Sequence, residues 1–161
     1  GNYATIKPFC ANNQEFQRNK ASSNLSERTL REIYLRPFKR AIRDGGARSV
    51  MTSYNPMNGI YNVVNKSLLE DYLRGECGFD GIVMTDWTST TPGMASPVGA
   101  IRAGNDMIMP GMFFDRIPLL LALRRGTLDP WDLQRCSERI IKVLLESEQG
   151  QKQIKDRRRH R

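Results

Sequence analysis

The first candidate for chemistry in this sequence is Asp86, which follows the short apolar run 82–84 and precedes Trp87. The run has no polar alternation, a pattern typical of a strand buried on both faces of a parallel sheet. In α/β folds, chemistry is done at the C-terminal ends of such strands, where Asp86 would stand. Asp86 is therefore a candidate catalytic carboxylate. An aspartate after a strand also commonly caps a helix or starts a turn, and the local pattern leaves that interpretation open.

The other residue types limit which reactions are possible. His160 is the only histidine, which excludes mechanisms that hold an imidazole beside a serine or cysteine nucleophile. The cysteines Cys10, Cys77 and Cys136 are far apart and form no CxxC pair, which excludes a structural zinc site. We expect neither a metal nor a cofactor. Carboxylates, Lys7, tyrosines and backbone groups remain as candidates.

Composition is that of an ordinary globular domain. Hydrophobic residues make up 39% of the 161 residues and charged residues 26%. No apolar run approaches the roughly 20 residues that span a bilayer, so we expect no membrane partner. The formal net charge of +8 is concentrated in residues 151–161, which hold six Lys or Arg and one acid. No basic stripe is interleaved with aromatic residues elsewhere, so we expect no nucleic-acid partner.

Hydrophobic patterning predicts about four βα units. The expected strands cover residues 3–9, 48–54, 81–85 and 106–109. The expected helices run from Ser26 to Gly45, from Asn65 or Ser67 to Gly75, from Val98 to Ala103, from Arg116 to Arg124, and from an Asp129 cap to Leu145. Helices between strands require parallel strands with right-handed crossovers, so the fold class is α/β.

Two architectures satisfy this order of elements. One is an open four-stranded sheet, and the other is part of a TIM (β/α)8 barrel, of which 161 residues supply about half if a full barrel takes about 250. Residues 1–148 are expected to form this domain. Residues 149–161 are polar and basic with no apolar face, and we expect them to be a disordered tail.

Five motifs carry a family resemblance. They are Lys-Pro-Phe-Cys-Ala-Asn-Asn-Gln-Glu at 7–15 with Arg18, the run 26–35, Val-Met-Thr-Ser-Tyr-Asn at 50–55 with Asn58 and Gly59, Gly-Phe-Asp-Gly-Ile-Val-Met-Thr-Asp-Trp at 78–87, and Ala-Gly-Asn-Asp at 103–106 with Met-Pro-Gly at 109–111. Together they resemble the barrel domain of glycoside hydrolase family 3, in its bacterial β-glucosidase type. The resemblance covers roughly residues 3–147 and corresponds to about the second half of that barrel.

The resemblance implies a retaining β-glycosidase that hydrolyses terminal β-glucosyl residues of β-glucosides or short oligosaccharides. In such enzymes one carboxylate attacks the anomeric carbon, and a second carboxyl, about 5 Å away, protonates the leaving oxygen and later activates water. Asp86 falls on the position of the nucleophile. This implication makes helix capping a secondary interpretation of Asp86.

The resemblance also assigns three substrate-binding residues. Lys7 falls on a sugar-binding lysine, whose ammonium can donate to adjacent hydroxyls, although an ordinary solvated lysine is the alternative. Tyr54 lies where the family has a tyrosine near the nucleophile, and ordinary aromatic packing is the alternative. Trp87 would stack on the glucose ring, with simple core burial as the alternative.

Some residues are expected to have other roles, or depart from the family. We expect Glu15, Arg18 and Asp106 to fix loops through ion pairs or turns rather than to catalyse. The family has a histidine directly after the lysine, where this chain has Pro8. Because a proline cannot donate to a sugar hydroxyl, one substrate contact is expected to be lost.

The resemblance finally leads us to expect a fragment. The first half of the family's barrel would precede residue 1, and the domain that usually supplies the acid/base would follow the last helix. An alternative from a different class is a non-catalytic carbohydrate-binding or half-barrel assembly module. Such a module would self-associate through its open barrel edges, because exposed strand edges invite pairing.

Overall fold

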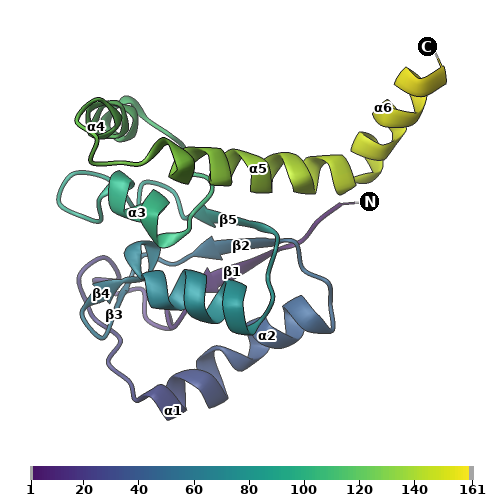
Figure 1. Ribbon diagram of the computed structural model, residues 1–161. Helices are drawn as coiled ribbons and strands as arrows, with labels where there is room; N and C mark the ends of the chain where they lie inside the picture. The colour runs from purple at the N-terminus through teal and green to yellow at the C-terminus, as the bar shows by residue number, and fades with distance from the viewer. Residues whose placement is uncertain (1, 160–161) are drawn as a thin grey trace.

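A computed structural model describes residues 2–159 and shows a parallel sheet with helices beside it (Figure 1). The sheet contains β1 (Thr5–Phe9), β2 (Ser49–Thr52) and β5 (Ile82–Thr85) in the order β1-β2-β5. All three strands run parallel, so each consecutive pair is joined by a helical crossover, as predicted.

Strand register brings the ends of β2 and β5 to the same level. Ser49 pairs with Ile82 and Thr52 pairs with Thr85, so the residues that follow both strands leave the sheet side by side. The register between β1 and β2 shifts between Ile6 and Phe9, where Pro8 lies. A proline is tolerated there because β1 is an edge of the described sheet, and a proline has no N–H to donate to a ladder.

The expected fourth strand, 106–109, lies beside β5 but makes only an isolated parallel bridge between Met84 and Met107. The backbone of Thr85 donates to the Met107 carbonyl at 3.0 Å. Side chains take the neighbouring ladder positions: the Asp106 carboxylate accepts from the Val83 N–H, and the Thr85 hydroxyl accepts from the Met109 N–H. The segment therefore has the predicted place and direction without a regular ladder.

The crossovers begin and end close to the predicted positions. Between β1 and β2 the chain is helical through α1 (Glu27–Thr29), η1 (Leu30–Tyr34) and α2 (Arg36–Arg43), and the Ser26 hydroxyl accepts from the Thr29 N–H as an N-cap. The small hairpin of β3 (Pro56–Met57) and β4 (Ile60–Tyr61) and the short helix η2 (Asn62–Val64) precede η3 (Ser67–Glu76). The hairpin turns at Asn58 and Gly59, which both have positive φ.

The last part of the domain is helical. It contains α3 (Pro97–Ala103), α4 (Phe113–Arg124) and α5 (Pro130–Glu146), and Asp129 caps α5 by accepting from the Trp131 N–H at 2.9 Å. In Figure 1, α5 lies on the β5 side of the sheet and α2 on the β1 side. The main core lies between the sheet and the helices that cover it, and includes Phe9, Val50, Leu69, Leu73 and Val83.

The C-terminal segment differs from the expected disorder. Residues Glu148–Arg159 form helix α6, which leads away from the sheet in Figure 1, and residues 160 and 161 lie outside the described residues. Local contacts explain the helix. The Ser147 hydroxyl accepts from the Gly150 N–H at 3.1 Å as a cap, and Lys152 pairs with Glu148 one turn away.

Within residues 2–159, no helix is long and apolar enough to cross a membrane. The same part of the chain contains no group of three or more His, Cys, Asp or Glu side chains arranged to hold a metal ion.

Candidate active site

The residues proposed for chemistry meet at the C-terminal edge of the sheet. Asp86 follows β5 directly, Tyr54 lies two residues beyond β2, and Lys7 lies in β1. The Tyr54 hydroxyl donates to Oδ1 of Asp86 at 3.2 Å, and Nζ of Lys7 donates to Oδ2 at 3.4 Å. Groups from β1 and from the end of β2 thus converge on the carboxylate that follows β5.

The loop that follows Asp86 fixes both its side chain and its backbone. The Trp87 N–H donates to Oδ1 at 2.7 Å, and the Ser89 hydroxyl donates to the Asp86 carbonyl at 2.9 Å. The next helix, α3, begins only at Pro97 and is capped by Ser96. Capping a helix is therefore not the role of Asp86. Its carboxylate is buried, held by one cation, one phenol and one amide, and oriented by all three.

Tyr54 connects this carboxylate to Arg18, a residue expected to fix its own loop. The Arg18 guanidinium lies 4.2 Å from the centre of the Tyr54 ring, and it pairs with Glu15 at 2.5 Å. Burial raises the pKa of Tyr54, and the charge of Asp86 and the hydrogen bond to it raise that pKa further. The phenol is therefore protonated over the physiological range and acts as a donor.

Arg18 was expected only to fix its loop, which its ion pair with Glu15 does. Its stacking on Tyr54 also places it beside the candidate site, and no local sequence pattern could have found this. The relation depends on how the loop 10–23 folds back over the end of β2. An arginine stacked on the donor to a carboxylate stabilises the position of that donor.

Trp87 lies on the surface with 57% of its area exposed. The alternative of core burial is therefore wrong for this residue. An indole adjacent to a fixed carboxylate and open on the outside is available to pack against a ligand.

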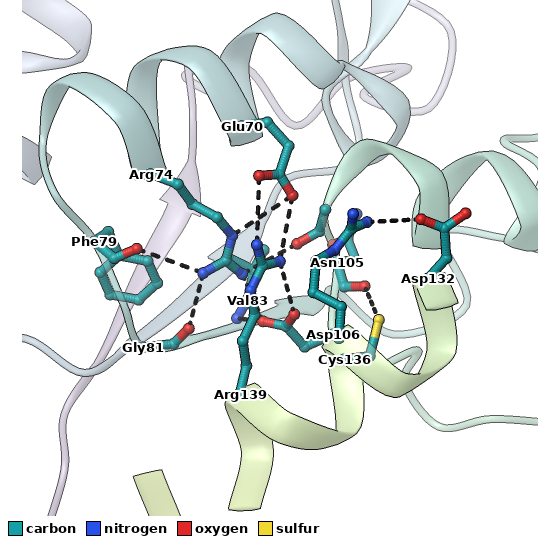
Figure 2. A network of polar contacts seen from close by, with 12 residues as sticks. Glu70, Arg74, Phe79, Gly81, Val83, Asn105, Asp106, Asp132, Cys136 and Arg139 are labelled. Atoms are coloured by element: carbon teal, nitrogen blue, oxygen red, sulfur yellow. Dashed lines mark hydrogen bonds and ion pairs between the residues drawn. The ribbon is translucent and has the colours of Figure 1, made fainter. Parts of the chain in front are cut away.

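A buried ion network lies beside β5 (Figure 2). The Asp106 carboxylate accepts from Arg74 at 2.6 Å, from Arg139 at 3.2 Å and from the Val83 N–H at 2.8 Å. Glu70 pairs with Arg139 at 3.2 Å. Burial raises the pKa of Asp106 more than the two guanidiniums lower it. The network ties η3, β5 and α5 together, which agrees with the structural role expected for Asp106.

Comparison with known proteins places this geometry in a family. The model of the glycosyl hydrolase family 3 N-terminal domain matches residues 2–142. The chain belongs to glycosyl hydrolase family 3. This confirms the predicted resemblance, and it agrees with polar groups gathered at the ends of parallel strands.

Curated relatives in this family include two that differ in substrate. The chain is 47% identical to a β-glucosidase of Rhizobium radiobacter over 144 residues, which cover 89% of this chain and 17% of the relative. It is 37% identical to an exo-α-(1→6)-L-arabinopyranosidase of Bifidobacterium longum over 140 residues, covering 87% of this chain and 18% of the relative.

Solved structures of the family have the same fold. The chain resembles β-glucosidase 3B from Thermotoga neapolitana in complex with glucose, with a TM-score of 0.84, 39% identity, and coverage of 93% of this chain and 22% of that one. This confirms the predicted α/β class with parallel strands as part of a barrel. The family 3 chain described here spans about a fifth of the length of the relatives it matches.

Proposed function

We propose that this chain carries the nucleophile and part of the sugar-binding site of a retaining β-glycosidase that acts on terminal β-glucosyl residues. The observation that supports this most directly is the convergence of Lys7 and Tyr54 on the Asp86 carboxylate. The β-glucosidases among the relatives of this chain support the glucosyl preference.

The proposed first step forms one bond and breaks another. Asp86 attacks the anomeric carbon, the bond from that carbon to the leaving oxygen breaks, and the leaving oxygen takes a proton from a second carboxylic acid. Oδ1 accepts from both Tyr54 and the Trp87 N–H, whereas the only side-chain donor to Oδ2 among the described residues is Lys7. Oδ2 is therefore the oxygen better placed to attack. Lys7 would then donate to the hydroxyls of the bound sugar, and Trp87 would pack against its ring.

The acid/base has no candidate among the contacts of Asp86. In the described chain, the side chains bonded to its carboxylate are an ammonium and a phenol, and neither is the carboxylic acid that the retaining mechanism uses. Because the chain covers about a fifth of its relatives' length, we propose that the acid/base belongs to a part of the protein outside this sequence.

The test compares leaving groups. Dinitrophenolate is a stable anion and leaves from its β-glucoside without taking a proton. The 161-residue chain is therefore expected to cleave dinitrophenyl β-glucoside slowly and to leave an alkyl β-glucoside intact. Asp86→Asn should abolish this activity, and the exposed Asp71→Asn should not. A 2-deoxy-2-fluoroglucoside should add its glycosyl mass to Asp86. Labelling at another residue would contradict the nucleophile, and turnover of the alkyl glucoside that depends on Asp86 would contradict an external acid/base.

The second candidate function is assembly of copies through exposed faces. Helix α4 exposes Phe113, Ile117 and Leu120, and helix α5 exposes Ile141 and Leu144. Exposed apolar side chains of this size on two helices favour covered surfaces. Sedimentation of the chain should then depend on concentration, and Leu120→Lys should shift it toward the monomer. A monomer at every concentration would rule out this candidate.

A further inference from the structure

A strongly basic cleft lies along helix α2, and none of the candidate active-site residues lines it. The cleft has a volume of about 740 Å³. Its cationic lining residues are Arg31, Arg36, Lys39, Arg40 and Arg43. The acids that line it are Glu32 and Asp44. Five cations against two acids leave an excess of three positive charges on this surface.

Helix periodicity gathers four of these cations on one face of α2. They stand at positions i, i+3, i+4 and i+7 of the helix and are Arg36, Lys39, Arg40 and Arg43. Side chains three or four residues apart are neighbours on a helix, and like charges at this spacing destabilise it. The opposite face packs inward, where the Phe38 ring lies 4.8 Å from the ring of Phe9. An anion bound to the outer face would remove the repulsion between the cations.

Three of these cations keep donors available for a ligand. Within residues 2–159, Arg36 and Lys39 make neither a hydrogen bond nor an ion pair. Nε of Arg40 lies 3.6 Å from Oδ2 of Asp44, which is beyond hydrogen-bond distance, and both side chains of that pair are exposed. Two guanidiniums and an ammonium are therefore free to donate into the cleft.

The other charged lining groups already have partners. Nη1 of Arg31 donates to the Glu76 carboxylate at 2.6 Å, and Nη2 of Arg43 donates to the Glu76 carbonyl at 2.6 Å. The Glu32 carboxylate accepts from Nε of Arg28 at 3.0 Å. These contacts fix Arg31 and Arg43 and leave Glu32 turned to a cation outside the lining. The three free cations are thus not neutralised by the chain itself.

The donor set indicates the chemistry of the ligand. Guanidinium and ammonium groups donate and do not accept, so the ligand must supply acceptors and negative charge. Phosphate places up to about two charges on one group and pairs bidentately with a guanidinium. A cleft of this volume suits a small ligand. The basic face extends about 10 Å along the helix, which fits a few linked phosphates and is short for a nucleic acid.

We propose that this cleft is a binding site for a compact oligophosphate. Its phosphate oxygens accept from the guanidiniums of Arg36 and Arg40 and from the ammonium of Lys39. The site shares no lining residue with the group around Asp86, so binding here does not depend on whether that carboxylate is a nucleophile.

The test is an amide NMR titration of the full chain with inorganic tripolyphosphate at low salt. Signals of residues 36–43 are expected to shift together and saturate, with a Kd on the order of 100 μM. Inorganic phosphate, which carries fewer charges, should bind at least about tenfold more weakly. Arg36→Gln combined with Lys39→Gln should weaken tripolyphosphate binding at least about tenfold, and glutamine keeps the helix propensity of the residues it replaces.

Lys152→Gln combined with Lys155→Gln is the matched control. Both lysines are exposed on α6, so this variant loses the same amount of charge as the first and should bind as the wild type does. Equal weakening by the two double variants would overturn the site, because net charge alone would then explain binding. Wild-type shifts confined to residues 148–156 would also overturn it, and this reading does not depend on any variant folding. Equal affinities for phosphate and tripolyphosphate, or tighter binding of a short oligonucleotide to α2, would contradict the proposed ligand.

Discussion

The Tyr54 hydroxyl lies 3.2 Å from Oδ1 of Asp86, although the two residues are 32 positions apart in the chain. Strand register explains this contact. Because Thr52 pairs with Thr85, the residues that follow β2 and β5 leave the sheet at the same level. Because of this contact, a change at Asp86 should alter the pKa of Tyr54, which can be measured.

Removing the charge of Asp86 should lower the pKa of Tyr54. Burial is the largest cause of the raised pKa, followed by the Asp86 charge and the hydrogen bond to it. Asp86→Asn removes the charge and leaves the burial, so the pKa should fall toward the ordinary value of about 10 without reaching it. Ultraviolet titration of phenolate measures the change, and Tyr54→Phe identifies which of the five tyrosines is responsible. Superimposable curves for the wild type and Asp86→Asn would disprove the coupling.

The two tryptophans allow a matched test of sugar contact. Trp87 and Trp131 are both 57% exposed, but only Trp87 adjoins Asp86. Methyl β-glucoside is expected to change the fluorescence of the Trp131→Phe variant and leave that of Trp87→Phe unchanged. Trp87→Ala should weaken binding about fivefold, since an aromatic–ligand contact is worth about 1 kcal/mol. Its stability should change by less than about 0.5 kcal/mol, because the ring is on the surface. Equal fluorescence changes in both single-tryptophan variants would argue against this role.

Local pattern predicted the elements that place the site. The apolar run before Asp86 indicated a buried strand, Ser26 and Asp129 cap helices as expected, and the turn at Asn58 and Gly59 follows from their tolerance of positive φ. These features depend on neighbours in sequence, so the sequence carries them directly. For Asp86 the local pattern left two interpretations, a catalytic carboxylate and a cap or turn. Only the motifs at the ends of the other strands favoured the first.

Features that depend on distant contacts were not predicted. The stacking of Arg18 on Tyr54 requires the fold of a whole loop, and the exposure of Trp87 depends on what surrounds it in three dimensions. The fourth strand was placed correctly but its ladder is incomplete, because the side chains of Thr85 and Asp106 replace backbone partners. Hydrophobic pattern contains no information on such replacements.

Asp106→Asn should destabilise the fold strongly. The Asp106 side chain is fully buried and pairs with Arg74 at 2.6 Å and with Arg139 at 3.2 Å, so the variant removes a buried carboxylate from two cations and leaves them with Glu70. Breaking a buried pair typically costs about 3–5 kcal/mol. Asp44→Asn is the control: its pair with Arg40 is exposed, and its loss should cost less than about 1 kcal/mol. Urea denaturation measures both free energies of unfolding. Similar losses for the two variants would show that the network contributes no more than a surface pair.

Burial of Cys136 should make stability fall in alkali. Burial raises the pKa of this thiol from 9.0 to about 11, so the folded state holds its proton more tightly than the unfolded state does. The contribution of the protonated thiol to the free energy of unfolding is fully present below pH 9.0 and is lost as the pH rises to about 11. Two pKa units correspond to about 3 kcal/mol.

Cys136→Ser isolates this contribution from the other groups that titrate in alkali. The Cys136 thiol donates to the Asn105 carbonyl at 3.3 Å, and a serine hydroxyl can donate in the same way but does not ionise in this range. Free energies of unfolding from urea denaturation should therefore fall more steeply with pH for the wild type than for the variant. The difference between the two proteins should be constant below about pH 8 and change by about 3 kcal/mol above it. Parallel curves throughout would mean that the thiol ionises equally easily in the folded and unfolded states.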